Sequence, residues 1–255
     1  NKMRKPIIVG NWKMNKTIKE AKEFVEAFDG FALKAKEQNI IVGIAPSFLA
    51  LDAANSLAKN MIVAAQNCHF KDSGAYTGDV SIPMLQEIGI KYCLIGHSER
   101  RLYSAETNYT CNLKMKALYA KGLVPMYCVG ETLEEYEAGN SKNVVRTQVV
   151  EGLADLTPEQ VSKLVIAYEP VWSIGTGRNA SKEIAQDICG YIREVVKELY
   201  SAEVADKVII QYGGSVKPEN SYDYLTCPDI DGVLVGGASL KPESFEALVS
   251  AIMKG

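Results

Sequence analysis

Eight short apolar runs recur along the chain, and a polar or glycine-rich stretch follows each of them. The runs occupy residues 7–9, 40–45, 61–65, 92–95, 124–129, 164–168, 208–212 and 232–235. Their residues favour β-structure and do not alternate between apolar and polar. This pattern is typical of strands buried on both faces of a parallel sheet. The sequence therefore predicts eight parallel strands.

Segments with helical spacing lie between the apolar runs. Thr17 is a predicted N-cap, because Glu20 follows three residues later and an apolar face comes next. Ser181 opens a second helix with apolar residues at helical intervals. Further helices are predicted over residues 104–121, 132–153 and 240–253, with one short piece after Tyr212.

Eight strand–helix units in 255 residues favour an α/β fold of the (β/α)8 barrel type, with eight parallel strands inside a ring of helices. An open doubly wound sheet is the alternative. We expect one domain that spans residues 1–255. In such a barrel, chemistry is located in the loops at the C-terminal ends of the strands.

Charge and composition restrict the partners of the chain. The net charge is -3, 47% of the residues are hydrophobic and 23% are charged. This balance argues against nucleic-acid and membrane-surface binding, which need a basic patch, but a small phosphate needs only local donors. Apolar runs are too short for a membrane span or a signal peptide. We therefore expect a cytoplasmic protein.

The six cysteines form no CxxC pair and lie in apolar contexts. Buried free thiols in a reducing compartment are a better interpretation than a disulfide framework. Cys128 is expected to be buried, and Cys189 and Cys227 are expected to be the more exposed positions. With only two histidines in the chain, a zinc site is not expected, so we predict no metal and no cofactor.

Polar residues follow five of the predicted strands. The first is followed by Asn11 and Lys13, the fourth by His97, Ser98 and Glu99, the sixth by Glu169, the seventh by Gly213, Gly214 and Ser215, and the eighth by Gly236 and Gly237. Each residue alone has an ordinary structural interpretation, such as a solvated lysine or a plain turn. Packing does not require their shared position at successive strand ends, so this position favours a function.

The residue types predict proton transfer on a phosphate ester. Paired glycines after the last two strands let backbone N–H groups approach a phosphate. Lys13 supplies a positive charge, and Asn11 supplies a donor. Glu169 is a candidate base, and His97 is a candidate donor to an oxygen that gains charge. One base and one neutral donor suffice for proton abstraction next to a carbonyl.

The chain also resembles the triosephosphate isomerase family at these same residues. The shared motifs are GNWKMN (10–15), AQN (65–67), GAYTGDVS (74–81), GHSERR (96–101), CVGET (128–132), AYEPVWSIGTG (167–177), YGGSV (212–216) and DGVLVGGASL (231–240). The resemblance implies a TIM barrel that interconverts dihydroxyacetone phosphate and D-glyceraldehyde 3-phosphate without a cofactor, in glycolysis and gluconeogenesis. The family is a well-known example of pKa tuning and loop closure.

The resemblance also implies a role for individual residues. Glu169 matches the general base, His97 the neutral electrophile, and Lys13 and Asn11 the substrate-binding pair. Glu99 matches a carboxylate near the lysine, with Ser98 beside it. The phosphate-binding groups match Gly175, Ser215, Gly236 and Gly237, and the mobile lid matches Pro170, Val171, Trp172, Ser173, Ile174, Gly175 and Thr176. Ser173 and the pair Arg178–Asn179 depart from the commoner family pattern in and after the lid.

A homodimer is a further implication of the resemblance. Residues 74–81 match a protruding loop that inserts into a neighbouring subunit, where Thr77 would approach the partner's Asn11 and Lys13. Met14 sits where the family receives this loop. Without the resemblance, a plain polar surface loop is the better interpretation.

Two other functions stay open on the residues alone. One is a different barrel enzyme for sugar phosphates, such as a Schiff-base aldolase that would use Lys13 or a metal-dependent epimerase. The other is a non-catalytic binding protein on the same fold. Borohydride trapping with substrate separates the aldolase from an isomerase.

Overall fold

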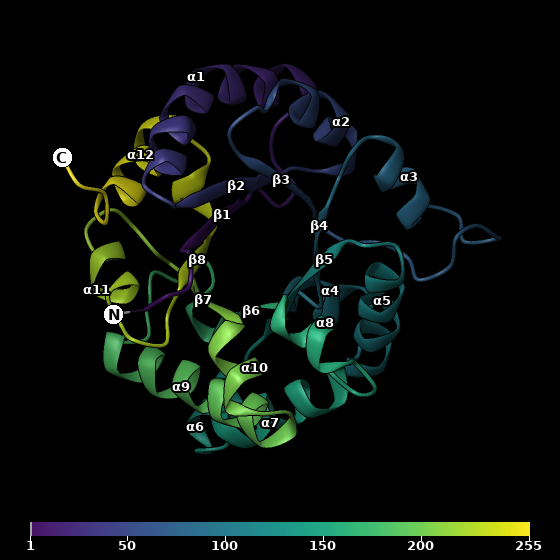
Figure 1. Cartoon of the computed structure of the whole chain (residues 1–255), viewed down its shortest axis with the longest axis vertical. Helices are drawn as coiled ribbons and strands as arrows, with labels where there is room; N and C mark the ends of the chain where they lie inside the picture. The colour runs from purple at the N-terminus through teal and green to yellow at the C-terminus, as the bar shows by residue number, and fades with distance from the viewer. Residues whose placement is uncertain (1) are drawn as a thin grey trace.

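The computed structural model describes residues 2–255, in which eight strands close into a parallel barrel in sequence order (Figure 1). Strand β8 pairs with β1 through Val9 opposite Leu234 and Gly10 opposite Val235. The strands are β1 (Ile7–Asn11), β2 (Ile41–Ala45), β3 (Ile62–Ala65), β4 (Tyr92–Ile95), β5 (Val124–Val129), β6 (Val165–Tyr168), β7 (Ile209–Gly214) and β8 (Gly232–Val235). The predicted fold class is confirmed.

Helices surround the strands in Figure 1 and cover the outside of the barrel. The α-helices of residues 2–255 are α1 (Ile18–Glu37), α2 (Phe48–Leu57), α3 (Ile82–Glu87), α4 (Ser98–Tyr103), α5 (Asn108–Ala120), α6 (Leu133–Glu137), α7 (Ser141–Gly152), α8 (Pro158–Ser162), α9 (Lys182–Leu199), α10 (Ala202–Lys207), α11 (Ser221–Leu225) and α12 (Pro242–Ser250). Two 3-10 turns are η1 (Val171–Ser173) and η2 (Gly237–Ser239).

Local capping signals set several helix ends. Thr17 caps α1, and its hydroxyl and the Glu20 carboxylate bond each other's backbone N–H groups. Ser181 caps α9 by accepting the N–H of Ile184 at 3.1 Å. Both predicted starts are confirmed, because the capping residue and its partner lie within one turn of each other.

Of the predicted helices, one is shorter in the structure and one is divided in two. Residues 104–121 contain only α5, because Ala105 takes a left-handed φ of 58° and Thr107 provides a new N-cap. Residues 132–153 hold α6 and α7, separated at Gly139, whose φ is 70°. A residue with positive φ ends an α-helix, and apolar spacing does not reveal it.

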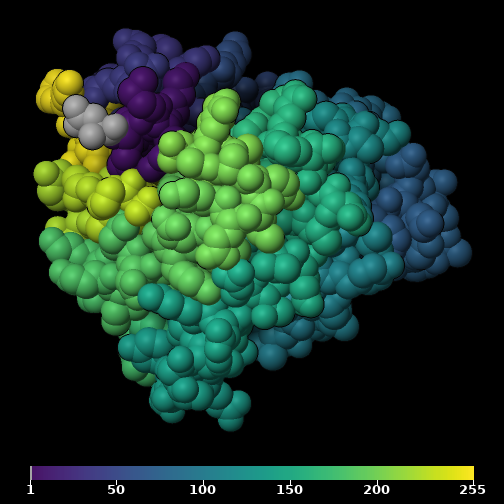
Figure 2. Space-filling model, turned by 60° about the horizontal axis from the view of Figure 1, so that its bottom comes forward, coloured from purple at the N-terminus to yellow at the C-terminus, as the bar shows by residue number. Residues whose placement is uncertain are grey.

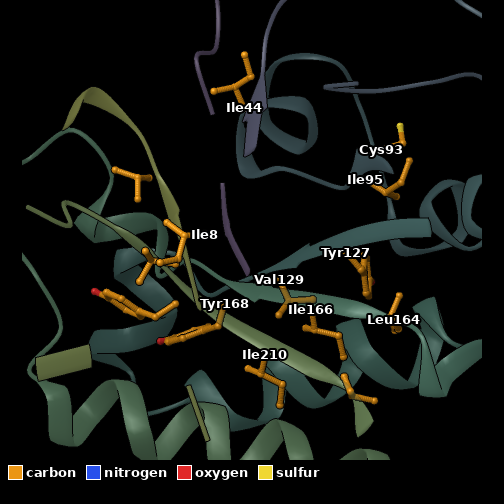
Figure 3. Packing of buried hydrophobic residues seen from close by; sticks show 14 of the residues in the cluster. Ile8, Ile44, Cys93, Ile95, Tyr127, Val129, Leu164, Ile166, Tyr168 and Ile210 are labelled. Atoms are coloured by element: carbon orange, nitrogen blue, oxygen red, sulfur yellow. The ribbon is translucent and has the colours of Figure 1, made fainter. Parts of the chain in front are cut away.

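Side chains alternate along each strand between the barrel interior and the layer under the helices. On β6, Val165 and Ala167 belong to the interior cluster, whereas Ile166 and Tyr168 belong to the outer core. Figure 3 shows members of the outer core, with Ile166 and Tyr168 among the labelled residues. Both faces of each strand are therefore buried, which explains the unbroken apolar runs in the sequence.

The two ends of the described chain meet where the barrel closes. In Figure 2 the purple N-terminal part and the yellow C-terminal part lie side by side. Residues 2–6 line one cavity together with Ile252 and Lys254, and Gln38, which follows α1, donates to the Lys254 carbonyl at 2.9 Å. The predicted domain of residues 1–255 includes Asn1, which lies outside the described residues.

All six thiols are free and buried, as expected. Cys128 is 2% exposed, and burial raises its pKa well above the usual value. The expectation for Cys189 is wrong, because helix α9 turns it into the core, where its exposure is 0%. Cys227 is 9% exposed and is the most accessible of the six.

Candidate active site

The alternation along the strands decides which side chains reach the barrel mouth. Val165 and Ala167 point inward on β6, so Glu169 continues on the inward side two residues later. Val9 points inward on β1, and Asn11 follows in the same way. Asn11 and Glu169 are 5% and 7% exposed. Asn11 and Glu169 therefore both point into the barrel mouth, because their strands run in the same direction and both residues stand at inward-facing positions.

Lys13 follows β1 in a left-handed backbone conformation, with a φ of 54°. Its backbone N–H donates to Oδ1 of Asn11 at 3.0 Å. Its ammonium Nζ lies 2.9 Å from Oε2 of Glu99. This ion pair is partly exposed, so it orients the lysine more than it stabilises the fold.

His97 and Glu169 face each other across the mouth. Nε2 of His97 lies 3.0 Å from Oε1 of Glu169, and both side chains are buried. Nδ1 of His97 accepts the backbone N–H of Glu99 at 3.1 Å, because His97 is the N-cap of α4. That bond requires an unprotonated Nδ1, so the neutral ring carries its proton on Nε2, on the side of Glu169.

Opposing effects act on the pKa of His97. Burial lowers the pKa of the imidazole, whereas the Glu169 carboxylate raises it, and in the substrate-free site the pKa lies above its ordinary value. The charge of Glu169 is thus the main influence that favours the imidazolium.

Two glycines make the seat for Glu169. A methyl group on Gly213 would lie 2.2 Å from Cγ of Glu169, and one on Gly130 would lie 1.8 Å from the Glu169 carbonyl oxygen. Gly214 leaves room for the Ser173 hydroxyl in the same way. The lack of side chains at Gly213 and Gly214 therefore makes room for Glu169 and for Ser173 of the lid. The sequence pattern instead predicts that this pair lets a ligand approach the backbone.

The second glycine pair is open toward the mouth. A methyl group on Gly237 would meet nothing within 4 Å, and one on Gly236 would meet only Cε of Lys13, at 4.0 Å. These two glycines fit the predicted close approach of a ligand to the backbone.

Four residues whose backbone N–H groups lack a protein acceptor in the described chain line one cavity, and we name this group of residues the anion corner. The cavity has a volume of about 640 Å³ and is also lined by Asn11, Lys13 and Glu169. Across residues 2–255, none of the four N–H groups donates to a protein acceptor. The anion corner consists of Gly175, Ser215, Gly236 and Gly237. Backbone N–H groups without a protein acceptor, beside a lysine, are suited to bind an anion.

The predicted lid is a short turn followed by an exposed tip. Residues Val171–Ser173 form η1, in which the N–H and the hydroxyl of Ser173 both donate to the Pro170 carbonyl, at 2.9 and 2.8 Å. Thr176 closes the tip by donating from its hydroxyl to the Trp172 carbonyl at 3.0 Å. Ser173 is fully buried, so this departure from the family pattern adds a hydrogen bond inside the lid.

Hydroxyl groups attach the lid to the barrel. The Ser215 hydroxyl donates to the Ser173 carbonyl at 2.9 Å. The Tyr212 hydroxyl accepts the N–H of Ala180 at 3.2 Å, and the Tyr224 hydroxyl donates to the Ala180 carbonyl at 2.5 Å. The middle of the lid is therefore held by Ser215, which follows β7, and the exit of the lid at Ala180 is held by β7 and α11.

The Trp172 side chain packs between two partners. Its ring lies 4.5 Å from that of Tyr136, and the Arg178 guanidinium lies 5.5 Å from its centre. Its buried Nε1 has no hydrogen-bond partner within residues 2–255. Arg178, the other departure in this region, thus contacts the first half of the lid.

A second cavity also borders Glu169. Its volume is about 660 Å³, and Ser98, Arg101 and Cys128 contribute to its walls. Ser98, to which the family resemblance gives a supporting role, thus lines this second cavity. The anion corner lines the first cavity.

The predicted dimer residues lie apart from both cavities. Met14 is 94% exposed, Thr77 is also exposed, and neither lines a cavity next to Glu169. Figure 1 shows the segment before α3 extending outward from the barrel. The single chain therefore does not bring Thr77 to the site.

Sequence reasoning missed two residues that support the site. Gln66 donates to the carbonyls of Lys13 and Ala45, at 2.9 and 2.8 Å. Tyr212 holds the lid exit. Both lie in quoted motifs, AQN and YGGSV, but no local pattern reveals their distant partners.

In the part of the chain that the structure describes, no three His, Cys, Asp or Glu side chains are grouped to hold a metal ion. No helix among residues 2–255 has the length and hydropathy needed to cross a membrane.

Comparisons with known proteins agree with this geometry. The family model described as Triosephosphate isomerase matches residues 6–252. A protein of Streptococcus gordonii named triosephosphate isomerase is 54% identical over 252 residues, covering 98% of this chain and 99% of its own. Proteins of the same name from Streptococcus pneumoniae and Streptococcus thermophilus are 53% identical with the same coverage.

Proposed function

The chain belongs to the triosephosphate isomerase family, and we propose that Asn11, Lys13, His97 and Glu169 carry out the family's proton transfer. The activity is the reversible interconversion of dihydroxyacetone phosphate and D-glyceraldehyde 3-phosphate in glycolysis and gluconeogenesis. The chain is thus an intramolecular aldose–ketose isomerase.

Glu169 acts as the base in this proposal. Its carboxylate takes a proton from the carbon next to the carbonyl, and the released electron pair forms the double bond of an enediolate. The same carboxyl then returns the proton to the neighbouring carbon, while the hydroxyl proton moves from one substrate oxygen to the other, so that carbonyl and hydroxyl exchange places. Its inward position and the glycine seat support this role, because a base must lie within hydrogen-bond reach of the proton that it takes.

His97 acts as a neutral donor from Nε2 to the oxygen that gains charge. The N–H of Glu99 on Nδ1 supports this tautomer. The Glu169 carboxylate raises the pKa of His97, and its negative charge passes to the substrate oxygen when Glu169 takes the substrate proton. The Nε2–H group of the neutral ring then donates to the oxygen on which the charge of the enediolate develops.

The anion corner is the main support for a phosphate monoester as the substrate class. Four free N–H groups with the Lys13 ammonium beside them match the oxygens of a phosphate monoester. Gly175 brings one of these groups from the lid, so phosphate binding and lid closure are coupled. Closure also excludes water, which protects an enediolate phosphate from loss of its phosphate.

A coupled assay in EDTA, with glyceraldehyde 3-phosphate as the substrate, tests this function. We expect rapid turnover without added metal or cofactor, and a loss of at least about 100-fold in Glu169→Ala. Folded wild-type protein without turnover would contradict the function, and wild-type-like turnover of the variant would contradict the role of Glu169. Borohydride inactivation in the presence of substrate would favour a Schiff-base enzyme at Lys13.

We propose a homodimer that forms through residues 74–81. Large apolar side chains are exposed on segments that follow strands β1 to β4, which are neighbours in the barrel. They are Met14, Phe48, Leu49, Tyr76, Met84, Leu102 and Tyr103. Such a patch supports a protein interface. A fall in specific activity on dilution, matched by a fall in mass in light scattering, tests the dimer.

We further propose that the chain works as one domain in the cytoplasm. The closed barrel supports the first part, because an interrupted barrel would leave unpaired strand edges. Six free buried thiols support a reducing compartment.

A further inference from the structure

Lys13 holds a backbone conformation that its own residue type disfavours. Its φ of 54° lies in the left-handed region, where a side chain with a Cβ is crowded. Such strain persists only where surrounding contacts fix it, and it concentrates at functional sites. The contacts that fix Lys13 therefore control where its ammonium lies.

Three partners fix three different groups of Lys13. Asn11 accepts its N–H at 3.0 Å, and Glu99 accepts its ammonium at 2.9 Å. The third partner is Gln66, whose Nε2 donates to the Lys13 carbonyl at 2.9 Å. Asn11 and Glu99 themselves belong to the site, whereas Gln66 has no place in the proposed chemistry.

Gln66 links two strand ends by two hydrogen bonds, and we call this pair of bonds the bracket. It follows β3 directly, and the same Nε2 also donates to the carbonyl of Ala45, the last residue of β2, at 2.8 Å. Both hydrogens of one planar amide are thus used, so the amide cannot rotate to release one carbonyl without weakening both bonds. The Lys13 carbonyl is thereby tied to the rigid barrel rather than to its own loop.

We propose that Gln66 is a positioning residue that holds Lys13 in its left-handed conformation and thereby aims the ammonium at the anion corner. The proposal rests on the proposed isomerase function. Without the bracket, the Lys13 peptide relaxes to negative φ, and the ammonium leaves the phosphate and the developing enediolate. The expected cost is a higher KM together with a lower kcat.

Gln66→Met tests the proposal, because methionine keeps the length of glutamine and removes both donors. We expect kcat/KM to fall about tenfold, the effect of losing one to two hydrogen bonds. Gln86→Met is the matched control, since Gln86 likewise donates to a lysine carbonyl, that of Lys121 at 3.0 Å, away from the mouth. The control should keep wild-type kinetics.

A double-mutant cycle separates positioning from general structural support. In a Lys13→Met background, Gln66→Met should have no further effect on kcat/KM, because the group that it positions is gone. An undiminished effect in that background would overturn the proposal. If the wild type turns over substrate and Gln66→Met has the same kcat and KM, the proposal for Gln66 is overturned, whereas the isomerase function is not.

A crystal structure of Gln66→Met gives a readout that needs no activity. The proposal expects Lys13 to leave the left-handed region and its Nζ to leave Glu99. An unchanged φ at Lys13 in the folded variant would overturn the proposal even if turnover falls.

Discussion

One side of the barrel mouth is built by contacts between different strands, and the other side is built mainly by contacts within one loop. We call the first side the fixed rim, which consists of Asn11, Lys13, Gln66, His97 and Glu99. Contacts between segments hold it: Lys13 pairs with Glu99 of α4, and Gln66, which follows β3, donates to the carbonyls of Lys13 and Ala45. Local bonds from the N–H of Lys13 to Asn11 and from the N–H of Glu99 to His97 fix the shape of each segment. The fixed rim is therefore joined to several parts of the closed barrel.

The lid side, residues 170–180, folds on itself. Ser173 bonds to Pro170 and Thr176 bonds to Trp172, so most of its hydrogen bonds close within four residues. It meets the rest of the protein through a few hydroxyl groups, one backbone bond from the N–H of Val171 to the Glu131 carbonyl at 2.9 Å, and the aromatic contact between Trp172 and Tyr136. Such a segment can detach as a unit, because few contacts need to break.

This difference matches two needs of the proposed reaction. The proton donor and the lysine must hold their geometry in every cycle, since small misplacements are costly. The lid must let substrate enter and product leave. Glu169 belongs to both sides, because it ends β6 and opens the lid.

The largest expected effect comes from Gly213→Ala, which breaks the seat between the two sides. The new methyl group would meet Cγ of Glu169 at 2.2 Å, so the base must move. We expect kcat to fall about 100-fold. Gly30→Ala in α1, where a methyl group meets nothing within 4 Å, is the control and should keep wild-type turnover. Full activity of Gly213→Ala would show that the seat does not place Glu169.

A smaller effect is expected from Tyr212→Phe, which removes one bond between the lid and the barrel. The ring can still stack on Tyr224 at 4.3 Å, but the N–H of Ala180 loses its acceptor. We expect kcat/KM to fall about three- to tenfold. Tyr119→Phe, which loses a comparable bond to the Gln160 carbonyl far from the lid, should not change the kinetics. Equal losses in the two variants would count against a lid-specific role.

Arg178→Ala should have the smallest effect on turnover. The guanidinium of Arg178, an exposed residue, lies over Trp172, where a cation–π contact shifts an equilibrium about two- to fivefold. We expect a change of that size in KM and a shift in Trp172 fluorescence. Arg178→Lys, which keeps the charge, should lie between wild type and alanine. Identical fluorescence in all three proteins would exclude the contact.

A final test concerns proton affinity at the fixed rim. Glu169→Gln removes the charge that raises the pKa of His97 and leaves the burial that lowers it. The pKa of His97 should therefore fall in this variant, so the imidazole becomes neutral at lower pH than in wild type. NMR titration measures this directly, with His69 as the internal control because the chain has only two histidines. An unchanged His97 titration would show that Glu169 does not set its protonation.

Much of the fold was predictable because its signals are local. Each apolar run is short enough to read as a strand, and caps such as Thr17 and Ser181 lie within one turn of their partners. Where a backbone angle broke the pattern, as at Ala105 and Gly139, the prediction joined or extended helices wrongly. The spacing of apolar residues along the sequence does not reveal such positions.

The sequence by itself determined which residue types end the strands, and hence that a base, a neutral donor, a lysine and paired glycines meet at the mouth. Only the tertiary structure decided how they touch. Gln66 holds Lys13 from 53 positions away, and Gly213 makes room for Glu169 rather than for a ligand. The alternation of side chains along a strand and the capping of a helix depend on residues close by in the sequence. The contacts of Gln66 and Gly213 depend on the stagger between strands once the barrel has closed.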